Sequence, residues 1–225
     1  MPTLADASVD LILTDPPYGI QYRSRKNKTI KNDKSPFIWW LYDAYRILDD
    51  RGCLLCFTRW DVLEAWRSAI QYAGFSIRSC IVWDKAHHGM GNTKAAFAPR
   101  HELLLFADKG GFAFPGHRPM DVLQVRKVPG AYMVHPTEKP VALLSMLIEA
   151  TTHPGAVVLD PFEGSGSTAE ACIHTNRNYI AIELVDEYCE QARKRVLAAK
   201  EGLHGNPLGS GEDADKRESQ ADCST

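Results

Sequence analysis

The sequence predicts an α/β fold in which a mainly parallel sheet is covered by helices on both faces. Two observations support this class. Short apolar runs, such as residues 11–13 and 157–159, alternate with longer stretches of helical periodicity. The residues that follow these two runs are rich in proline, glycine and acidic side chains, as in loops at the carboxyl ends of strands. Strands that alternate with helices are typical of a parallel sheet.

The amino-terminal half contains the first strands and two helices of this plan. Residues 10–14 contain the apolar run 11–13 and predict a buried strand, and residues 19–35 are a long polar loop. Ser35 followed by Pro36 favours a helix start, so we expect a helix over 36–49. The further elements expected here are a strand over 52–58, a helix over 61–73 closed by Gly74, and strands over 77–83 and 103–107.

The carboxyl-terminal half continues the alternation after an insert. Residues 108–134 have many glycines and prolines but little periodicity, so we expect an irregular insert on the scaffold. Apolar residues on one face predict a helix over 140–152. Asp186 is expected to cap the last helix. The remaining elements are a strand over 156–159, a helix over 168–174, a strand over 179–182 and a helix that ends near residue 200.

The length of 225 residues suits one domain with a substantial core, which we place at residues 1–200. The tail, 201–225, is rich in Gly, Ser and Asp and is expected to be disordered. It carries six acids and two bases, so the net charge of −2 for the chain becomes +2 for residues 1–200. A near-neutral domain binds a polyanion when its bases gather on one surface.

The sequence predicts neither a metal site nor a membrane span. Cys53 and Cys56 form a C-x-x-C pair inside an apolar run, and no second ligand pair follows at short spacing, so we interpret them as buried strand cysteines. No apolar run approaches the roughly 20 residues of a span. The amino-terminus lacks the basic and then apolar layout of a signal peptide, so a cytoplasmic location is expected.

The loop after the strand at 156–159 predicts a nucleoside-like cofactor. Gly164 and Gly166 lack a Cβ, so the main chain can turn sharply and approach a ligand closely. Glu183 follows Gly164 by 19 residues, where a carboxylate can accept hydrogen bonds from both ribose hydroxyls. No Gly-Lys-Ser/Thr ends the loop, and the charge of Asp160 suits an ammonium group better than a pyrophosphate. A ligand such as S-adenosylmethionine, whose methionine part carries an ammonium group, fits this pattern.

The tetrapeptide Asp15-Pro16-Pro17-Tyr18 predicts a site for an aromatic amine. Its two prolines stiffen the loop and remove two backbone donors. An amino group on a nucleobase is a poor nucleophile, because its lone pair is delocalised into the ring. Hydrogen bonds from its two N–H groups to the Asp15 carboxylate and the Pro16 carbonyl would localise that pair. Tyr18 would hold the base flat by stacking, worth roughly 1–3 kcal/mol.

With both loops considered, the chain closely resembles the S-adenosylmethionine-dependent amino-methyltransferases of DNA, in the permuted class whose catalytic loop precedes the cofactor loop. The resemblance runs from about Val9 to Lys194. Besides the two loops it is carried by Arg46-Ile47-Leu48, Trp83-Asp84-Lys85, Arg100-His101-Glu102 and His135-Pro136-Thr137-Glu138-Lys139-Pro140. It implies a Rossmann-like methyltransferase sheet in a circularly permuted order.

The resemblance also implies the reaction and the residues that carry it. The target base would be flipped into the pocket at residues 15–18, because its amino group lies within the base stack. DPPY resembles the N6-adenine version of this tetrapeptide, whereas cytosine-N4 relatives more often begin with Ser. Residues that match Thr137 and Lys139 line the methionine end of the cofactor. The expected cofactor residues are Asp160, Pro161, Phe162, Gly164, Ser165, Gly166, Thr168, Glu183, Thr137 and Lys139.

The chain departs from the family at one place. Relatives usually have an additional strand and a Gly-Asp turn, which contacts the adenine of the cofactor, before the run that matches residues 9–14. Residues 1–8 predict no such strand, so other residues would have to cover the adenine. A nucleic-acid-binding relative with impaired catalysis is therefore an alternative interpretation.

Basic residues directly follow the catalytic tetrapeptide and predict contacts with DNA. Arg23, Arg25, Lys26, Lys28, Lys31 and Lys34 fall within twelve residues, opposed only by Asp33. At the rim of the pocket they would neutralise phosphates and give salt-dependent, sequence-independent affinity. The insert at 108–134 is where relatives keep target recognition. We expect an adenine-N6 methyltransferase of double-stranded DNA from a phage or restriction–modification setting; cytosine-N4 or RNA as the target, and a homodimer, remain open.

Overall fold

The computed structural model of the chain describes residues 1–20, 33, 37–89, 94–128 and 138–202. The elements of the first half are β1 (Val9–Thr14), α1 (Trp40–Ile47), β2 (Leu48–Thr58), α2 (Leu63–Tyr72), β3 (Ser76–Asp84) and β4 (His101–Asp108). Those of the second half are β5 (Val122–Gln124), α3 (Val141–Thr151), β6 (Val157–Asp160), α4 (Ser167–His174), β7 (Asn178–Ala181) and α5 (Asp186–Lys200).

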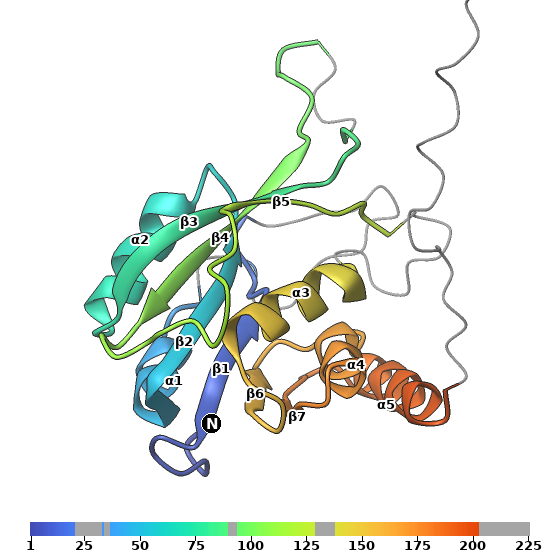
Figure 1. Cartoon of the computed structure of the whole chain (residues 1–225). Coiled ribbons are helices and arrows are strands. Elements are labelled where there is room, and N and C mark those ends of the chain that lie inside the picture. The colour runs from blue at the N-terminus through green and yellow to red at the C-terminus, as the bar shows by residue number, and fades with distance from the viewer. Residues whose placement is uncertain (21–32, 34–36, 90–93, 129–137, 203–225) are drawn as a thin grey trace, which may run out of the picture.

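These strands form one sheet in the order β5-β3-β4-β2-β1-β6-β7 (Figure 1). β1 pairs in parallel with β2 on one side and with β6 on the other, and β6 pairs in parallel with β7. Among the described strands, β4 alone runs against its neighbours, because it is antiparallel to both β2 and β3. The predicted mainly parallel sheet is therefore confirmed.

The chain leaves β1 and β6 in opposite directions across the sheet. β1 leads through α1 to β2, whereas β6 leads through α4 to β7, on the other side. The strand order therefore reverses between β1 and β6, and right-handed crossovers place α1 and α4 on opposite faces. In open α/β sheets, ligands bind beyond the carboxyl ends of the strands at such a point. The loops after Thr14 and Asp160 flank it.

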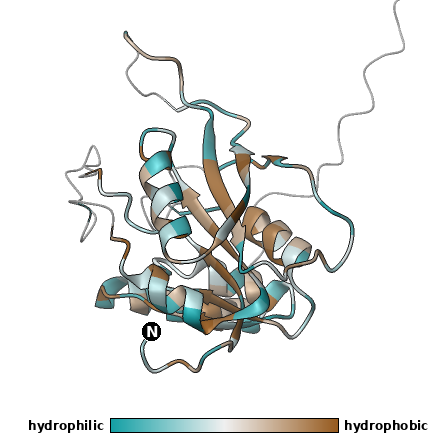
Figure 2. Ribbon diagram, turned by 90° about the vertical axis from the view of Figure 1, so that its left-hand side faces the viewer, coloured by the Kyte–Doolittle hydropathy of each residue, from teal (hydrophilic) through white to brown (hydrophobic). Residues whose placement is uncertain are grey.

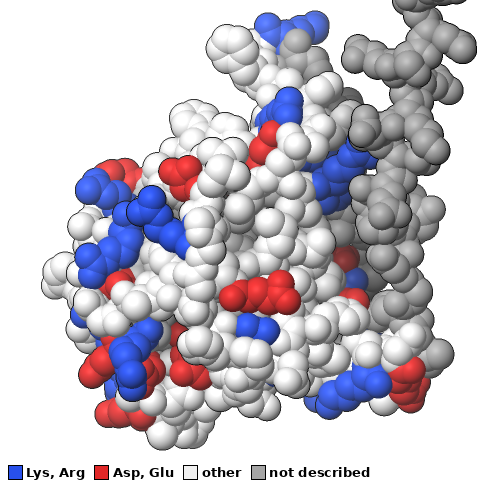
Figure 3. All heavy atoms as spheres, in the orientation of Figure 1, with Lys and Arg blue, Asp and Glu red and all other residues white. Residues whose placement is uncertain are grey.

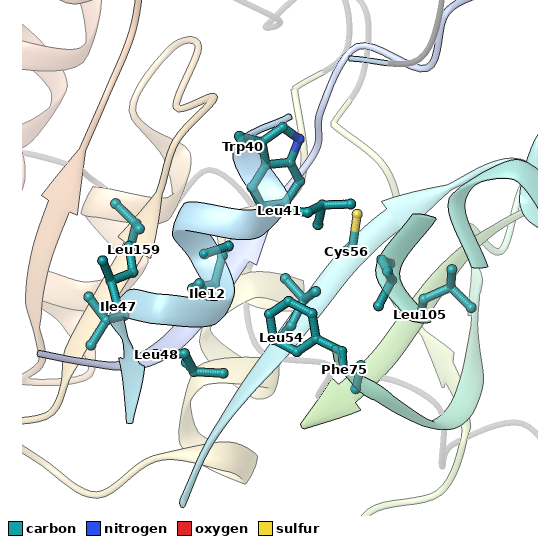
Figure 4. Close-up of a cluster of buried hydrophobic side chains, with 14 of the residues drawn as sticks. Ile12, Trp40, Leu41, Ile47, Leu48, Leu54, Cys56, Phe75, Leu105 and Leu159 are labelled. Carbon is teal, nitrogen blue, oxygen red and sulfur yellow. The ribbon is translucent and has the colours of Figure 1, made fainter. Parts of the chain in front are cut away.

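Each face of the sheet has its own apolar core. On one face α1 and α2 pack over Ile12, Leu54 and Leu105, and the cluster extends to Trp40 and Phe75 (Figure 4). On the other face α3 and α4 pack over the alternate residues of the same strands. Figure 2 accordingly colours the central strands mostly brown, while the helices mix brown with teal. Strands covered on both faces must be apolar at successive positions, which is why residues 11–13 and 157–159 are apolar runs.

The C-x-x-C pair is confirmed as two buried strand cysteines. Cys53 and Cys56 are fully buried on β2, and burial raises the pKa of both thiols. Three residues apart on a strand, they point to opposite faces and belong to different cores. Within the described ranges, no three His, Cys, Asp or Glu side chains gather as metal ligands would. The described helices also include none with the length and apolar character of a membrane span.

The structure corrects the sequence-based prediction at the first helix, the insert and the last helix. The first helix covers Trp40–Ile47, and it ends there because β2 begins at Leu48, which pairs with Val9. The insert is not irregular throughout: β5 pairs in parallel with β3, and Trp83 Nε1 donates a hydrogen bond to the Val125 carbonyl at 2.8 Å. Asp186 is the first residue of α5 and not its cap, a position that Val185 holds.

The segment before β1 contains no strand within residues 1–8, as expected. Arg46 of α1 holds this segment in place. Its guanidinium donates hydrogen bonds to the Leu4 carbonyl at 2.8 Å and the Met1 carbonyl at 3.3 Å, and it pairs with Asp6 at 2.5 Å. Because residues 1–8 add no strand to the sheet, β7 is an edge among the described strands and pairs with β6 alone.

Candidate active site

The tetrapeptide at residues 15–18 leaves the carboxyl end of β1 at the centre of the sheet. Both oxygens of the Asp15 carboxylate have partners: Oδ1 accepts a hydrogen bond from the Tyr18 hydroxyl and Oδ2 from the Lys139 ammonium group. Burial, and then the Asp15 charge, raises the pKa of Tyr18 well above its usual value. Tyr18 is therefore a neutral donor that helps to fix the Asp15 carboxylate.

The predicted cofactor loop, which is the glycine loop at residues 160–168, lies directly beside this tetrapeptide. β1 and β6 are paired in register, Ile12 against Leu159, so both loops emerge at the same edge of the sheet. Asp160 Oδ1 accepts a hydrogen bond from the Thr14 hydroxyl at 2.8 Å, which joins the residues just before the two loops. The predicted adjacency of the catalytic and cofactor loops is confirmed. Ligands held by the two loops would therefore lie side by side.

Asp160 is a buried carboxylate with several donors. Besides Thr14, the Thr168 hydroxyl and the Phe162 amide donate to it, at 2.7 and 3.0 Å. Burial raises its pKa to about 6, although these three hydrogen bonds oppose the rise. Burial and the neighbouring Asp160 also raise the pKa of Glu163, whose Oε1 accepts the Ala169 amide at 3.0 Å. Two weakly acidic carboxyl groups thus lie under the loop, and Asp160 lines the cavity.

The glycines of this loop adopt conformations that favour glycine. Gly164 has φ +59° and Gly166 has φ +90°, both in the left-handed region. The Gly164 amide donates to Glu183 Oε2 at 2.9 Å, and Glu183 Oε1 accepts the amides of Leu184 and Val185 at 2.8 and 2.9 Å. Glu183, which lies 19 residues after Gly164 in the sequence, is therefore in direct contact with it. Its carboxylate is held by three backbone donors at the cavity wall.

A cavity of about 770 Å³ joins the two loops. Asp15, Pro16, Pro17 and Tyr18 line its middle. The side under β6 and β7 is lined by the predicted Asp160, Pro161, Phe162, Gly164, Ser165, Thr168 and Glu183. The side under β2, β3 and β4 is lined by Phe57, Arg59, Trp60, Trp83, Lys85, His101 and Glu102, with Lys127 of the insert. Gly166 is not part of the wall but packs behind the loop, against Ala192 of α5.

Arg195 of α5 is a site residue that the sequence reading missed. Its guanidinium pairs with Glu138 and lies 3.1 Å from Glu170 Oε2, and it donates to the Ser167 hydroxyl at 2.7 Å and to Ser165 Oγ at 3.2 Å. These contacts tie the segment before α3, the cofactor loop, α4 and α5 together. A single arginine on a polar helix gives no sequence signal for such a role.

Lys139 lies at the junction of the two sides. Its ammonium group contacts the Asp15 carboxylate, lies 3.4 Å from Glu102 Oε2 and lies 4.7 Å from the centre of the Phe57 ring. The expectation that Lys139 lines the methionine end of the cofactor remains a prediction. Thr137, expected beside it, lies outside the described residues.

The predicted basic loop also lies outside the described residues, so the roles of Arg23, Arg25, Lys26, Lys28 and Lys31 remain predictions. On the face shown in Figure 3, basic and acidic side chains of the described residues are interspersed around a broad uncharged area. Asp33, which is described, is buried, and its Oδ1 accepts the Gly19 amide at 2.6 Å and the Ile20 amide at 3.2 Å. It therefore anchors the chain just after the catalytic tetrapeptide.

Comparison with known sequences agrees with this geometry. A family model described as DNA methylase matches residues 9–194. The YubD protein of Escherichia coli (strain K12) is 38% identical over 208 residues, which cover 90% of this chain and 88% of YubD. The type II methyltransferase M.HpaI of Haemophilus parainfluenzae is 31% identical over 220 residues, which cover 86% of this chain and 69% of M.HpaI.

Solved structures share the architecture. The crystal structure of the M1.HpyAVI–SAM complex superposes with a TM-score of 0.66 and 28% identity, over 85% of this chain and 89% of that one. The PvuII DNA methyltransferase, which is cytosine-N4-specific, superposes with a TM-score of 0.69 over 92% of this chain and 84% of that one. Because the identity is only 17%, this likeness supports the fold alone. With its two loops joined at the switch point of the sheet, this chain belongs to the N6/N4 DNA methylase family.

Proposed function

We propose that this protein transfers a methyl group from S-adenosylmethionine to the N6 amino group of adenine in DNA. The DNA methylase family supports DNA as the substrate, and the M1.HpyAVI–SAM complex supports the cofactor. The choice of adenine rests on the resemblance of the Asp15–Tyr18 tetrapeptide to the N6-adenine version. The observation that carries the proposal is the shared cavity, in which Asp15 and the glycine loop face one space beyond β1 and β6.

The residues on the β6 side fit S-adenosylmethionine. Gly164 brings bare backbone to the cavity, and its φ of +59° would strain a residue with a Cβ. Asp160 supplies a carboxylate for the cationic methionine end, and Glu183 supplies acceptor oxygens for the ribose hydroxyls. Phe162 and Ile182 add apolar wall for a flat heterocycle. When bound, the cofactor supplies a methyl group on a sulfonium, whose sulfur keeps the bonding electron pair as the methyl leaves.

The residues that line the middle of the cavity, 15–18, would make the acceptor nitrogen more nucleophilic. An Asp15 oxygen and the Pro16 carbonyl would accept the two N–H groups of the amine, which localises the nitrogen lone pair toward the methyl carbon. The lone pair forms the new N–C bond, and the nitrogen, now cationic, releases one proton to water. Tyr18, with its hydroxyl held on Asp15, would stack on the base. The base reaches this position only after extrusion from the duplex.

The reaction is tested by incubating the purified protein with labelled S-adenosylmethionine and DNA and then separating the nucleosides. Label in N6-methyladenine is the expected result. Label confined to 4-methylcytosine would overturn the choice of base but keep the reaction class. Transfer to RNA alone would overturn the choice of substrate, and cofactor binding without any transfer would favour a nucleic-acid-binding relative.

Trp60 is expected to contact the DNA at the rim of the cavity. Its indole follows β2, lines the side of the cavity under β2, β3 and β4 (the target side) and is 75% exposed. Because stacking of a base on an aromatic ring is worth roughly 1–3 kcal/mol, Trp60→Ala should raise the Kd for DNA about 5- to 160-fold. Fluorescence anisotropy with labelled duplex DNA measures this change.

Trp39→Ala is the matched control, because Trp39 is 70% exposed on the flank of α1, where it stacks on Tyr42, and does not line the cavity. Its affinity for DNA should stay at the wild-type value. Affinity for S-adenosylhomocysteine should be unchanged in both variants. Equal losses of DNA affinity at the two tryptophans would contradict a specific role for Trp60.

The affinity for S-adenosylmethionine should rise with pH through about 6. The buried Asp160 has its pKa raised to about 6, so in the free protein it is largely protonated below that pH. A cationic ligand favours the ionised carboxylate, so binding below pH 6 must first remove the proton. The association constant should therefore fall by up to about tenfold per pH unit below 6 and level off above about 7.

Calorimetry across this pH range measures the effect, and Asp160→Asn should remove the pH dependence while weakening binding at neutral pH. The amide keeps an acceptor for Thr14 or Thr168, so the loop is expected to retain its structure. A wild-type affinity that is flat from about pH 5 to 7.5 would show that Asp160 does not face the cationic end of the ligand.

A further inference from the structure

Lys139 forms a buried bridge between two carboxylates that come from different parts of the sheet. It precedes α3, and its side chain is 9% exposed. Its ammonium group contacts Asp15, which follows β1, and lies 3.4 Å from Glu102 at the start of β4. Lys85, after β3, lies 3.3 Å from Glu102 on the other side. The four groups form a row of alternating charges, Asp15, Lys139, Glu102 and Lys85, along the target side of the cavity.

These charges support one another. Burial by itself would lower the pKa of Lys139, but Asp15 and Glu102 outweigh it and raise that pKa. Burial would raise the pKa of Glu102, but Lys139 and Lys85 outweigh it and lower that pKa. At neutral pH Lys139 is therefore positive and Glu102 negative. Neither group is poised to take up the proton released from the methylated amine, so the row is suited to holding geometry.

We propose that Lys139, anchored by Glu102, is a positioning residue that fixes the Asp15 carboxylate toward the incoming amino group. The proposal rests on the function proposed above. It differs from the expected role at the methionine end of the cofactor, because here Lys139 acts through Asp15.

The geometry explains how such positioning would act. A free aspartate rotates about its side-chain bonds, so its oxygens do not keep one direction. Here Tyr18 binds Oδ1 and Lys139 binds Oδ2, so both oxygens are fixed before a base arrives. Each carboxylate oxygen has more than one lone-pair site, so an amine hydrogen can still be accepted without release of either partner. A misplacement of about 1 Å at such a group can lower the rate about 100-fold.

The test compares Lys139→Met, Lys139→Arg and the control Lys109→Met. Lys109 resembles Lys139, since it lies 3.3 Å from Asp50 and 5.0 Å from the centre of the Tyr45 ring, but it lies outside the cavity. Lys139→Met should lower kcat about 100-fold, with the KM for DNA and the affinity for S-adenosylhomocysteine within about threefold of wild type. Lys139→Arg keeps the charge, so its kcat should be at least about a tenth of the wild-type value. Lys109→Met should retain the wild-type kcat.

The pH profile and a double-mutant cycle separate positioning from a structural role. Asp15 is faced by Tyr18, Cys56 and Asp160 besides Lys139, and Glu102 faces Lys139 from its other side. Without the lysine, Glu102 loses one of the two cations that lower its pKa, so the pKa of Glu102 should rise and the acidic limb of kcat should move to higher pH. In an Asp15→Asn background, Lys139→Met should cost less than threefold in kcat, because its target is already altered. A full 100-fold loss in that background would overturn the proposal.

Two further outcomes are decisive. Loss of S-adenosylhomocysteine binding in Lys139→Met, with circular dichroism unchanged, would assign Lys139 to the cofactor and overturn the positioning role. If the wild-type protein methylates no nucleic acid, the proposed function fails. Crystal structures of wild type and Lys139→Met would still test whether Lys139 positions the Asp15 carboxylate. An Asp15 carboxylate that keeps its place without the lysine overturns the positioning role, whereas a rotated carboxylate supports it.

Discussion

Replacing Asp15 with alanine should lower kcat by about 1,000-fold, the loss expected when a preorganised hydrogen-bonding group is removed from a transition state. The amine would keep the Pro16 carbonyl as an acceptor but lose the charged Asp15 carboxylate. Its lone pair would then stay delocalised in the ring, and attack on the methyl carbon would be slow. Single-turnover transfer of labelled methyl to DNA measures the loss.

Cofactor binding should survive this substitution. In the structure the Asp15 side chain contacts Tyr18 and Lys139 and makes no hydrogen bond to the glycine loop. The affinity for S-adenosylhomocysteine in Asp15→Ala should therefore stay within about threefold of wild type, since no ligand contact from that loop is lost. Asp15→Asn keeps one acceptor oxygen and should lose less activity than alanine does.

Asp10→Ala is the control within the same strand. Asp10 lies on β1 toward its amino end, where its Oδ2 accepts the Val157 amide at 2.7 Å. This variant loses a carboxylate hydrogen bond and some stability but should retain the wild-type kcat. If Asp15→Ala turned over at a rate similar to that of Asp10→Ala, Asp15 would have no part in the chemistry.

The parts of this site that sequence reading could predict are those encoded locally. A tetrapeptide or a glycine loop is written in consecutive residues, and its place at the end of an apolar run fixes where it lies in a parallel sheet. The place of Glu183 near the glycine loop could also be predicted, because one βαβ unit sets the distance between its two strand ends, although nothing in the sequence predicts its hydrogen bond with Gly164.

The contacts that sequence reading missed join residues far apart in the chain. Lys139 meets Asp15 across 124 residues, and Arg195 meets Glu138 across 57. Which charged side chains meet depends on helix rotation and on the docking of α3 and α5, and neither is visible in a periodicity pattern. The resemblance placed Lys139 in the site, but its partners Asp15 and Glu102 follow from the order of β1 and β4 in the sheet.

The second large effect is expected at Gly166, where Gly166→Ala should destabilise the protein and weaken cofactor binding together. Gly166 has φ +90°, a conformation that costs a residue with a Cβ about 1–2 kcal/mol. A Cβ there would also lie 2.8 Å from the Cα of Ala192, which belongs to the backbone of α5. Relief of this overlap requires α5 or the loop to move, and overpacking of this kind costs about 1–3 kcal/mol more.

Movement of α5 would carry Arg195 with it. Arg195 lies one turn after Ala192 and holds Ser165 and Ser167 of the cofactor loop through its guanidinium. Displacement of this loop should weaken S-adenosylhomocysteine binding about 10- to 100-fold, which corresponds to a loss of about 1.4–2.7 kcal/mol in binding free energy. Thermal unfolding and calorimetry measure the two effects on the same sample.

Gly155→Ala separates backbone strain from the close contact. Gly155 has φ +85°, yet a Cβ there would meet no atom within 4 Å, and the residue lies in the turn before β6, away from the cavity. It should cost about 1–2 kcal/mol in the free energy of unfolding and leave cofactor affinity unchanged. Equal stability losses in the two variants would mean that α5 yields freely to a methyl group. In that case the packing of α5 against Gly166 would not shape the cofactor loop.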